Sequence, residues 1–191
     1  MRKLTAFNFI TLNGFFKGPH DDISWHKHGE EEGEYSIEAM KADNILLFGR
    51  ITYEMMEGYW STQQAMTNDP VVAEAMNSSE KIVFSNTLKK AGWNNTSLVS
   101  GDIIDAVRKM KQTPGKDLTI LGSGTIVSQF AEAGLIDEYE IMVDPVVIAD
   151  GTPMFKGIKQ ELNLQLTGTR VFKSGVVLLR YSNGERTENM R

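Results

Sequence analysis

The sequence contains no cysteine, few prolines and only three histidines among its 191 residues. Without cysteine, the chain cannot form disulfides, use a thiolate nucleophile or bind a metal through sulfur. His20, His26 and His28 lie close together, but no H-E-x-x-H spacing of carboxylate and histidine occurs, so we expect no metal site. A G-x-S-x-G motif is also missing, so no serine nucleophile of that type is present.

Positive charge and long apolar runs are scarce as well. The net charge is −5, whereas nucleic-acid-binding proteins are usually basic, and an anionic membrane surface is an equally unfavourable partner. No apolar run approaches the roughly 20 residues of a membrane span, and the first residues lack the apolar core of a signal peptide. We therefore expect a cytoplasmic protein whose partner is a small-molecule substrate rather than nucleic acid or a membrane.

The composition is otherwise that of an ordinary globular protein, with 41% hydrophobic and 24% charged residues. The length fits one domain spanning residues 1–191. We found no internal repeat, linker or domain boundary. Residues 183–191 are polar, and we expect them to fray.

Strand-like and helical patterns alternate along most of the chain. Two β-prone runs then follow each other without a helix, at 164–172 and 176–181, as in an antiparallel hairpin. The order predicts an α/β fold with a mostly parallel sheet and an antiparallel edge. The patterns predict strands at 4–12, 45–48, 81–85, 96–99, 118–121 and 137–143, and helices at 30–42, 50–56, 69–76, 102–111 and 123–133.

The most informative segment is 118–130, where an apolar run ends in Gly122-Ser-Gly124 and passes directly into a helical pattern. Such a junction directs backbone N–H groups and the positive end of a helix dipole at one point, which suits a phosphate. The third glycine of G-x-G-x-x-G is replaced by Val127, so the segment is not a standard Rossmann fingerprint. The alternative is a tight turn that binds nothing.

Two further predicted strands end in polar residues. Gly49, Arg50 and Thr52 follow one of them, and a guanidinium and a hydroxyl there suit a phosphate. Ser85-Asn-Thr87 follows another, with groups that can hold a sugar or a phosphate. Alternatively, Arg50 pairs with a carboxylate, and the second segment is only a turn. Because ligands of α/β sheets bind at the carboxyl ends of the strands, a dinucleotide could span all three loops.

The rest of the site is expected from the first strand and the loops after it. Asn8, Phe15 and Trp25 are candidate substrate contacts. Asp21 and Glu34 are candidate carboxylates for proton transfer. For the acidic cluster that contains Glu34, a solvated helix start is the competing interpretation.

Several of these motifs together resemble the dihydrofolate reductase superfamily. The branch most similar to this chain is that of the reductase domain of the riboflavin-biosynthesis deaminase-reductase. The matching segments occur in the right order over nearly the whole chain: Thr11-Leu-Asn-Gly-Phe15, Leu46-Leu-Phe-Gly-Arg-Ile-Thr-Tyr-Glu54, Lys81-Ile-Val-Phe-Ser-Asn-Thr-Leu88, Leu121-Gly-Ser-Gly124, Gly134-Leu-Ile-Asp-Glu-Tyr139, Pro145-Val-Val-Ile-Ala-Asp-Gly-Thr-Pro-Met-Phe155 and Lys173-Ser-Gly-Val-Val-Leu-Leu-Arg-Tyr181.

The resemblance implies a three-layer sandwich, one antiparallel C-terminal strand, a homodimer, and an NADPH site across the strand ends. Asn13 and Gly14 would then lie near the nicotinamide. The other implied cofactor contacts are Gly49, Arg50 and Thr52 at the phosphates, Ser85, Asn86 and Thr87 at the adenosine ribose and its 2′-phosphate, and Gly122, Ser123, Gly124 and Thr125 at the pyrophosphate.

Two positions depart from the family pattern. Asn86 stands where the family often has Arg or Lys, and an amide cannot neutralise a 2′-phosphate, which leaves NADH possible. Asn13 stands where the family often has Asp. No counterpart of the dihydrofolate reductase acid can be placed, which argues against folate reduction.

Three functions remain open from the sequence. The first is an NAD(P)H-dependent reductase that transfers hydride to a small heterocycle of the pteridine or pyrimidine kind, or to a carbonyl. The second is a non-catalytic nucleotide-binding module of the same fold. The third is a homodimeric scaffold.

Overall fold

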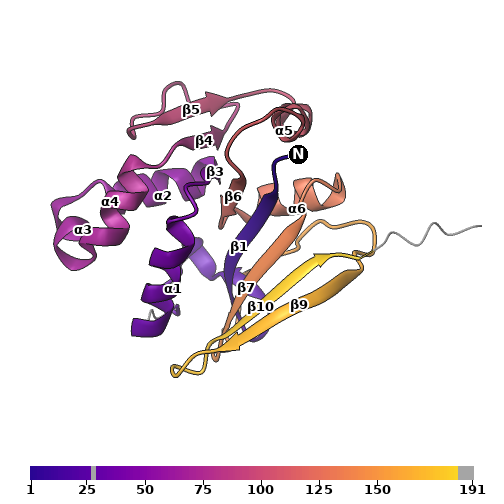
Figure 1. Ribbon diagram of the computed structural model, residues 1–191. Coiled ribbons are helices and arrows are strands. Elements are labelled where there is room, and N and C mark those ends of the chain that lie inside the picture. The colour runs from indigo at the N-terminus through magenta and orange to yellow at the C-terminus, as the bar shows by residue number, and fades with distance from the viewer. Residues whose placement is uncertain (27–28, 185–191) are drawn as a thin grey trace, which may run out of the picture.

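The computed structural model describes residues 1–26 and 29–184 and contains an eight-stranded sheet (Figure 1). The strand order in this sheet is β5-β4-β3-β6-β1-β7-β10-β9. β2 and β8 form a separate two-stranded sheet beside it. The strands are β1 Leu4–Thr11, β2 Phe15–Lys17, β3 Ile45–Gly49, β4 Lys81–Phe84, β5 Thr96–Val99, β6 Leu118–Leu121, β7 Glu138–Asp144, β8 Thr152–Pro153, β9 Leu164–Val171 and β10 Val177–Asn183.

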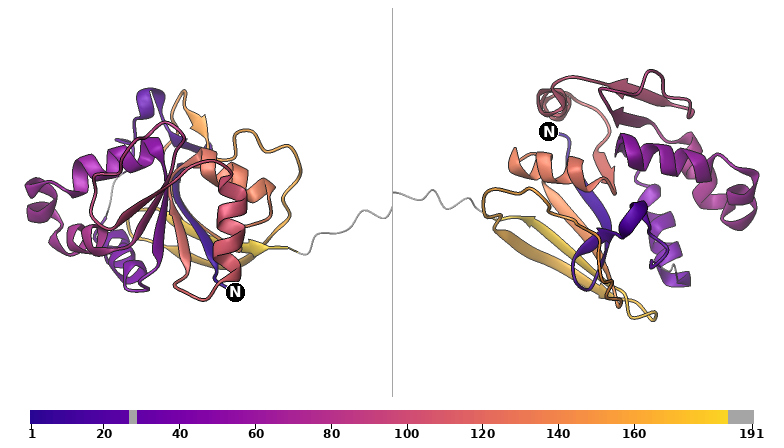
Figure 2. Two further views of the ribbon diagram at one scale, coloured as in Figure 1. Left: turned by 90° about the horizontal axis from the view of Figure 1, so that it is seen from above. Right: turned by 180° about the vertical axis from the view of Figure 1, so that it is seen from behind.

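Helices cover both faces of the large sheet. The first four pack on one face and the last two on the other, so the molecule has three layers, as expected (Figure 2). The 3₁₀ turn Pro19–Asp21 precedes them. The helices are α1 Glu30–Met40, α2 Arg50–Trp60, α3 Gln63–Asn68, α4 Pro70–Ser78, α5 Ile103–Gln112 and α6 Gly124–Glu132.

The strand directions confirm the predicted sheet. β5, β4, β3, β6, β1 and β7 are all parallel to one another, and β10 is antiparallel to both β7 and β9. β3 lies among these strands, and its residues 45–48 are all buried. The continuous apolar sequence of β3 therefore reflects a strand covered by helices on both faces.

Separate apolar clusters fill the two interfaces between sheet and helices. On one face, Val127 and Phe130 of α6 are fully buried against β1, β3 and β6. On the other face, Tyr53 of α2, Met76 of α4 and Trp93 pack on β3 and β4. Each such side chain contributes about 1.5–3 kcal/mol to folding relative to an exposed one. These clusters hold the helix N-termini against the carboxyl ends of the strands.

Some element boundaries differ from the expectation. α2 continues to Trp60, about one turn beyond Met56. Asp69 is the residue before α4, as expected for an N-cap, but its side chain makes no capping hydrogen bond, and the same residue ends α3. Gly134 does end α6 in the left-handed conformation, at φ +65°. No helix within the described ranges is long and apolar enough to cross a membrane.

The C-terminal hairpin extends further than the sequence pattern indicated. β10 runs to Asn183, whose side-chain amide donates to the carbonyl of Ile136. The next residue, Gly184, donates its N–H to Asn163 O at 2.9 Å. Residues 183 and 184 are therefore held by hydrogen bonds, whereas residues 185–191 of the expected frayed tail lie outside the described residues.

Candidate functional site

The three polar strand ends lie next to one another. β4, β3 and β6 are consecutive in the sheet and run in the same direction, so Ser85, Gly49 and Gly122 lie side by side at their carboxyl ends. A cleft of about 1760 Å³ opens along this edge and continues between the sheet and α1. A single extended ligand can therefore reach all three loops.

The junction between β6 and α6 has the backbone shape that an anion site needs. Gly122 and Ser123 are both in the left-handed region, at φ +62° and +59°, which turns the chain sharply into the helix. A Cβ on Gly122 would lie 3.2 Å from Cγ2 of Thr52. Within residues 1–26 and 29–184, the N–H groups of Gly124 and Thr125 have no acceptor, as is usual for the first turn of a helix.

The β3–α2 loop is fixed to this junction. The N–H of Gly49 donates to Oγ of Ser123 at 2.8 Å, so the N-termini of α2 and α6 converge on the same part of the cleft. Arg50 lines the cleft, but its guanidinium pairs with Glu54 one turn along α2 at 2.8 Å. Both of these side chains are more than 40% exposed, and such a pair contributes little to stability, so Arg50 can turn toward a ligand.

The loop after β4 is organised by its own side chains. Oγ of Ser85 accepts from the N–H groups of Thr87 and Leu88 at 3.1 and 3.0 Å, which is the turn-forming role considered from the sequence. Oδ1 of Asn86 accepts from the N–H of Gly101 at 2.8 Å. Ser85, Asn86 and Gly101 line the cleft, whereas Thr87 does not.

The other end of the cleft holds two buried donors without partners. Nδ2 of Asn8 and Nε1 of Trp25 are both inaccessible to solvent and make no hydrogen bond within the described part of the chain. Both residues line the cleft. A buried N–H without an acceptor costs about 1–3 kcal/mol, and a polar ligand entering this end of the cleft can recover that energy.

His26 and Asp144 form a pair at this same end, which the sequence did not reveal. Nδ1 of His26 lies 3.0 Å from each carboxylate oxygen of Asp144. The two side chains are only 8% and 4% exposed, and His26 lines the cleft. The partners are 118 residues apart in the sequence, so no local spacing could have indicated the pair.

The loop predicted to lie near the nicotinamide is held beside the cleft rather than in its lining. Asn13 accepts from Oγ1 of Thr11 at 2.8 Å and donates to the carbonyl of Ile148 at 2.8 Å. Gly14 adopts φ +84°, and Phe15 packs against Gly151. Asn13, Gly14 and Phe15 are therefore not among the residues that line the cleft, and their contacts with a nicotinamide or a substrate stay predictions.

Both candidate carboxylates line the cleft. Asp21 is exposed and pairs with Lys17. Glu34 is exposed on α1. Two other members of the acidic cluster are bonded to the β9–β10 turn: Glu31 pairs with Lys173 at 2.8 Å, and the buried Glu32 accepts from the hydroxyl of Ser174.

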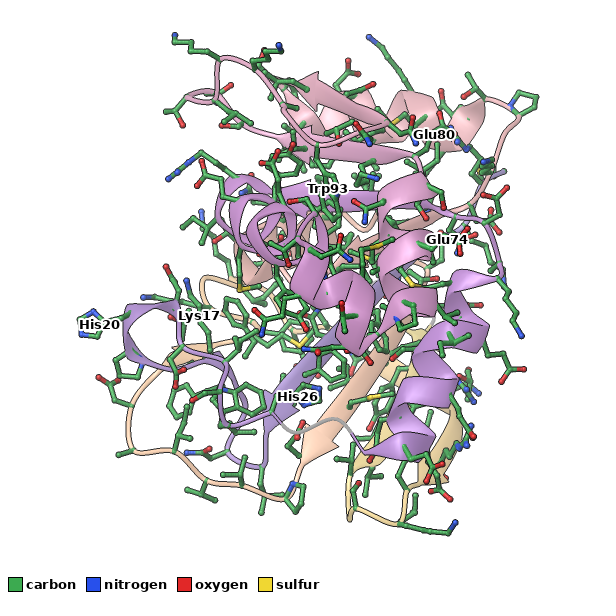
Figure 3. All side chains as sticks on the ribbon, turned by 90° about the vertical axis from the view of Figure 1, so that its left-hand side faces the viewer. Lys17, His20, His26, Glu74, Glu80 and Trp93 are labelled. Atoms are coloured by element: carbon green, nitrogen blue, oxygen red, sulfur yellow. The ribbon has the colours of Figure 1, made fainter. Side chains whose placement is uncertain are left out.

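The described residues contain no group of three or more His, Asp or Glu side chains that could hold a metal ion. His20 is exposed and points away from the molecule, whereas His26 points inward toward the cleft (Figure 3). His28, the third histidine of the cluster considered from the sequence, lies outside the described residues.

The three-layer fold, with a glycine-rich junction at adjacent strand ends, is that of a dihydrofolate-reductase-like α/β domain. A family model described as the RibD C-terminal domain matches residues 2–178. The chain therefore belongs to the RibD C-terminal domain family, the reductase branch that the sequence motifs resemble.

Two curated relatives come from Bacillus subtilis (strain 168). The uncharacterized protein YyaP is 29% identical over 172 residues, covering 90% of each chain. The uncharacterized protein YwjB is 26% identical over 181 residues, covering 93% of this chain and 96% of its own. Both relatives span nearly the same length as this chain.

Solved structures confirm the fold. A protein of Shewanella sp. PV-4 assigned to riboflavin biosynthesis has a TM-score of 0.74 at 20% identity, covering 96% of this chain and 99% of its own. A pyrimidine reductase-like protein of Corynebacterium diphtheriae has a TM-score of 0.64 at 14% identity, covering 96% and 92%. The Thermotoga maritima diaminohydroxyphosphoribosylaminopyrimidine deaminase/5-amino-6-(5-phosphoribosylamino)uracil reductase has a TM-score of 0.70 at 13% identity, with 96% of this chain matching 57% of that one.

Proposed function

We propose that this protein is an NAD(P)H-dependent reductase that transfers hydride to a C=N or C=O carbon of a small pyrimidine- or pteridine-like heterocycle. The observation that carries the proposal is the single cleft that joins three adjacent strand ends to a buried polar end. Membership of a reductase family supports the same conclusion.

The residues along the strand ends fit a dinucleotide. The N–H groups of Gly124 and Thr125 and the N-terminus of α6 suit the pyrophosphate. Arg50 can pair with a phosphate oxygen once it leaves Glu54. Ser85 and Asn86 supply hydroxyl and amide groups for the adenosine ribose. When bound, NADPH supplies a hydride from C4 of its nicotinamide.

The buried end of the cleft fits the nicotinamide and a flat heterocyclic substrate. Asn8 and Trp25 offer N–H donors that need acceptors, and carbonyl oxygens and ring nitrogens of a pyrimidine are suitable acceptors. Phe9 lines the same region and gives it an apolar wall. These residues would orient the substrate and exclude water, so that the donor and acceptor carbons lie about 3–3.5 Å apart.

Two structural relatives have names that refer to pyrimidine compounds. One is described as pyrimidine reductase-like and another as a 5-amino-6-(5-phosphoribosylamino)uracil reductase. At 13–14% identity these structures support the fold, and the substrate class rests on the donors described above. Folate itself is not part of the proposal.

Two measurements test the proposal. NADPH and NADH are first titrated into the protein and followed by their fluorescence. Oxidation of NADPH is then followed by absorbance with 5-amino-6-ribosylaminouracil 5′-phosphate, 7,8-dihydrobiopterin and pyridine-3-carbaldehyde as probes. Saturable binding together with turnover of a probe supports the reductase. Binding without turnover indicates the nucleotide-binding module instead, and the absence of saturable binding contradicts both functions.

A further inference from the structure

The pair of His26 and Asp144 lies where two parallel strands end. Asp144 is the last residue of β7 and is the register partner of Thr11, the last residue of β1. His26 reaches it from the loop before α1, and the ring of Phe9 lies against the imidazole with centroids 3.8 Å apart. The imidazole is therefore fixed between an aromatic ring and a carboxylate.

The carboxylate of Asp144 also determines which nitrogen of the His26 imidazole can exchange its proton with a ligand. An ionised carboxylate only accepts hydrogen bonds, so Nδ1 of His26 must donate to Asp144 across the 3.0 Å contact. The ring is then an Nδ1–H tautomer when neutral, and Nε2 is the nitrogen that gains and loses a proton. A buried carboxylate is costly without a partner, so the burial of Asp144 favours a hydrogen bond from Nδ1 of His26.

His26 lines the same end of the cleft as the two unpaired donors. Asn8 and Trp25 would hold the substrate there, and the rings of Trp25 and His26 are 6.0 Å apart. Among the described histidines, His26 alone lines the cleft. Histidine is the side chain best suited to exchange a proton near neutral pH.

We propose that His26 is the proton donor of the reduction and that Asp144 is its positioning residue, an assignment that rests on the reductase function proposed above. The hydride and its electron pair pass from C4 of the nicotinamide to the carbon of the C=N or C=O bond. The π electrons of that bond move to its nitrogen or oxygen, which takes the proton from Nε2 of His26. The imidazole becomes neutral and is reprotonated from solvent.

Other charged groups on the same cleft come from each of the surrounding elements. Glu30 and Glu34 belong to α1. Two further carboxylates near this end form ion pairs. Asp21 pairs with Lys17, and Oε1 of Glu140 in β7 lies 3.2 Å from Nε of Arg180 in β10. Asp144 contacts His26 through both of its carboxylate oxygens, each 3.0 Å from Nδ1.

Nuclear magnetic resonance of ¹⁵N-histidine-labelled protein tests the assignment without a substrate. The His26 signals are identified by their loss in His26→Asn, and His20→Asn is the matched exposed control, since Asn tolerates the φ of +57° at that position. We expect the neutral His26 ring to carry its proton on Nδ1. Saturating NADP⁺ should shift the His26 signals, whereas 2′,5′-ADP, which lacks the nicotinamide, should leave them unchanged.

The kinetic test uses whichever probe the wild type reduces. His26→Asn keeps an N–H donor for Asp144 but removes the transferable proton, so kcat should fall about 10²–10⁴-fold while the Kd for NADPH changes less than about twofold. Asp144→Asn should lower kcat less, and Asp144→Glu should restore part of it. His20→Asn should retain wild-type kcat.

Failure of the assignment can be told apart from failure of the reductase. If NADP⁺ binds saturably but leaves the His26 signals unchanged, or if the neutral ring carries its proton on Nε2, the assignment is wrong and the reductase stands. Retention of kcat in His26→Asn has the same meaning. If NADP⁺ does not bind at all, the proposed reductase function is contradicted, and so is the proposed role of His26.

Discussion

Oγ of Ser123 accepts a 2.8 Å hydrogen bond from the N–H of Gly49. This contact joins the residue before α6 to the residue before α2, and Ser123, which is 7% exposed, lines the cleft. The N-termini of the two helices, 74 positions apart in the sequence, are thereby held next to each other. Their dipoles reinforce each other at the site proposed for the pyrophosphate.

Removing this hydroxyl should weaken cofactor binding. Ser123→Gly deletes the acceptor for Gly49 and adds no backbone strain, because glycine readily adopts the φ of +59° at this position. We expect the Kd for NADPH to rise about tenfold and the free energy of unfolding to fall by about 1 kcal/mol. Calorimetric titration and urea unfolding measure the two effects. Ser97→Ala, at an exposed position in β5, should change neither, and an unaltered Kd in Ser123→Gly would contradict the prediction.

The choice between NADPH and NADH should depend on position 86. Asn86 offers no positive charge for a 2′-phosphate, and its Oδ1 is bonded to the N–H of Gly101. Asn86→Arg should raise the ratio of NADPH to NADH affinity about tenfold through a charge-assisted hydrogen bond. Loss of the bond to Gly101 affects both cofactors alike and cancels in the ratio. The ratio is measured by fluorescence titration at two salt concentrations, and a gain that persists unchanged at high salt would argue against an ionic cause.

The contact between α1 and the C-terminal hairpin should be a stability determinant. Glu32 is 1% exposed and accepts from the hydroxyl of Ser174 in the β9–β10 turn. A double-mutant cycle with Glu32→Gln and Ser174→Ala should give a coupling free energy of about 1–2 kcal/mol in urea unfolding. Glu38→Gln on the exposed side of α1 is the control and should be neutral. A coupling near zero would mean that the helix is held to the hairpin by its apolar residues alone.

Lys81 should make stability depend on alkaline pH. Its side chain is 1% exposed, and its Nζ donates to the carbonyls of Met76 and Ser79 at the end of α4. Burial lowers the pKa of Lys81 from 10.5 to about 8. Between these two values the unfolded chain binds more protons than the folded one, so stability relative to a variant without the ammonium rises with pH.

The comparison is with Lys81→Met, which keeps the length of the side chain. The free energy of unfolding of the wild type, minus that of the variant, should increase by about 2 kcal/mol from pH 7 to pH 9.5. Urea unfolding at several pH values measures the difference. A difference that is flat or that decreases over this range contradicts a pKa lowered by burial.

The sequence predicted the parts of the fold that local pattern determines. The strands Thr96–Val99 and Leu118–Leu121 were predicted with the bounds found in the structure, because each is a short β-prone run between turn residues. α3 was not predicted, since Gln63–Asn68 is polar and lacks apolar periodicity. The pairing of β2 with β8 joins two very short strands far apart in the chain, which no local pattern can indicate.

The sequence likewise indicated one part of the candidate site but not the other. The glycine-rich strand ends carry their own sequence signature, and the order of the strands places them side by side. The buried end is made by tertiary contacts between distant segments. His26 contacts Asp144, and the side-chain N–H groups of Asn8 and Trp25 are shielded from solvent without an acceptor in the described part of the chain. A lone histidine in a loop has no pattern that distinguishes it from a surface residue, so its pairing with Asp144 could be found only from the structure.

The central claim, that a dinucleotide binds across the three strand ends, is tested most directly by calorimetric titration of NADPH into the wild type, Gly122→Ala and Gly168→Ala. A Cβ on Gly122 would meet Thr52 at 3.2 Å on a backbone of φ +62°, whereas one on Gly168 in β9 has only ordinary contacts. Saturable binding that is weakened at least tenfold in Gly122→Ala, with Gly168→Ala unchanged, is the predicted result. No saturable binding by the wild type, or equal affinity in all three proteins, would contradict the account.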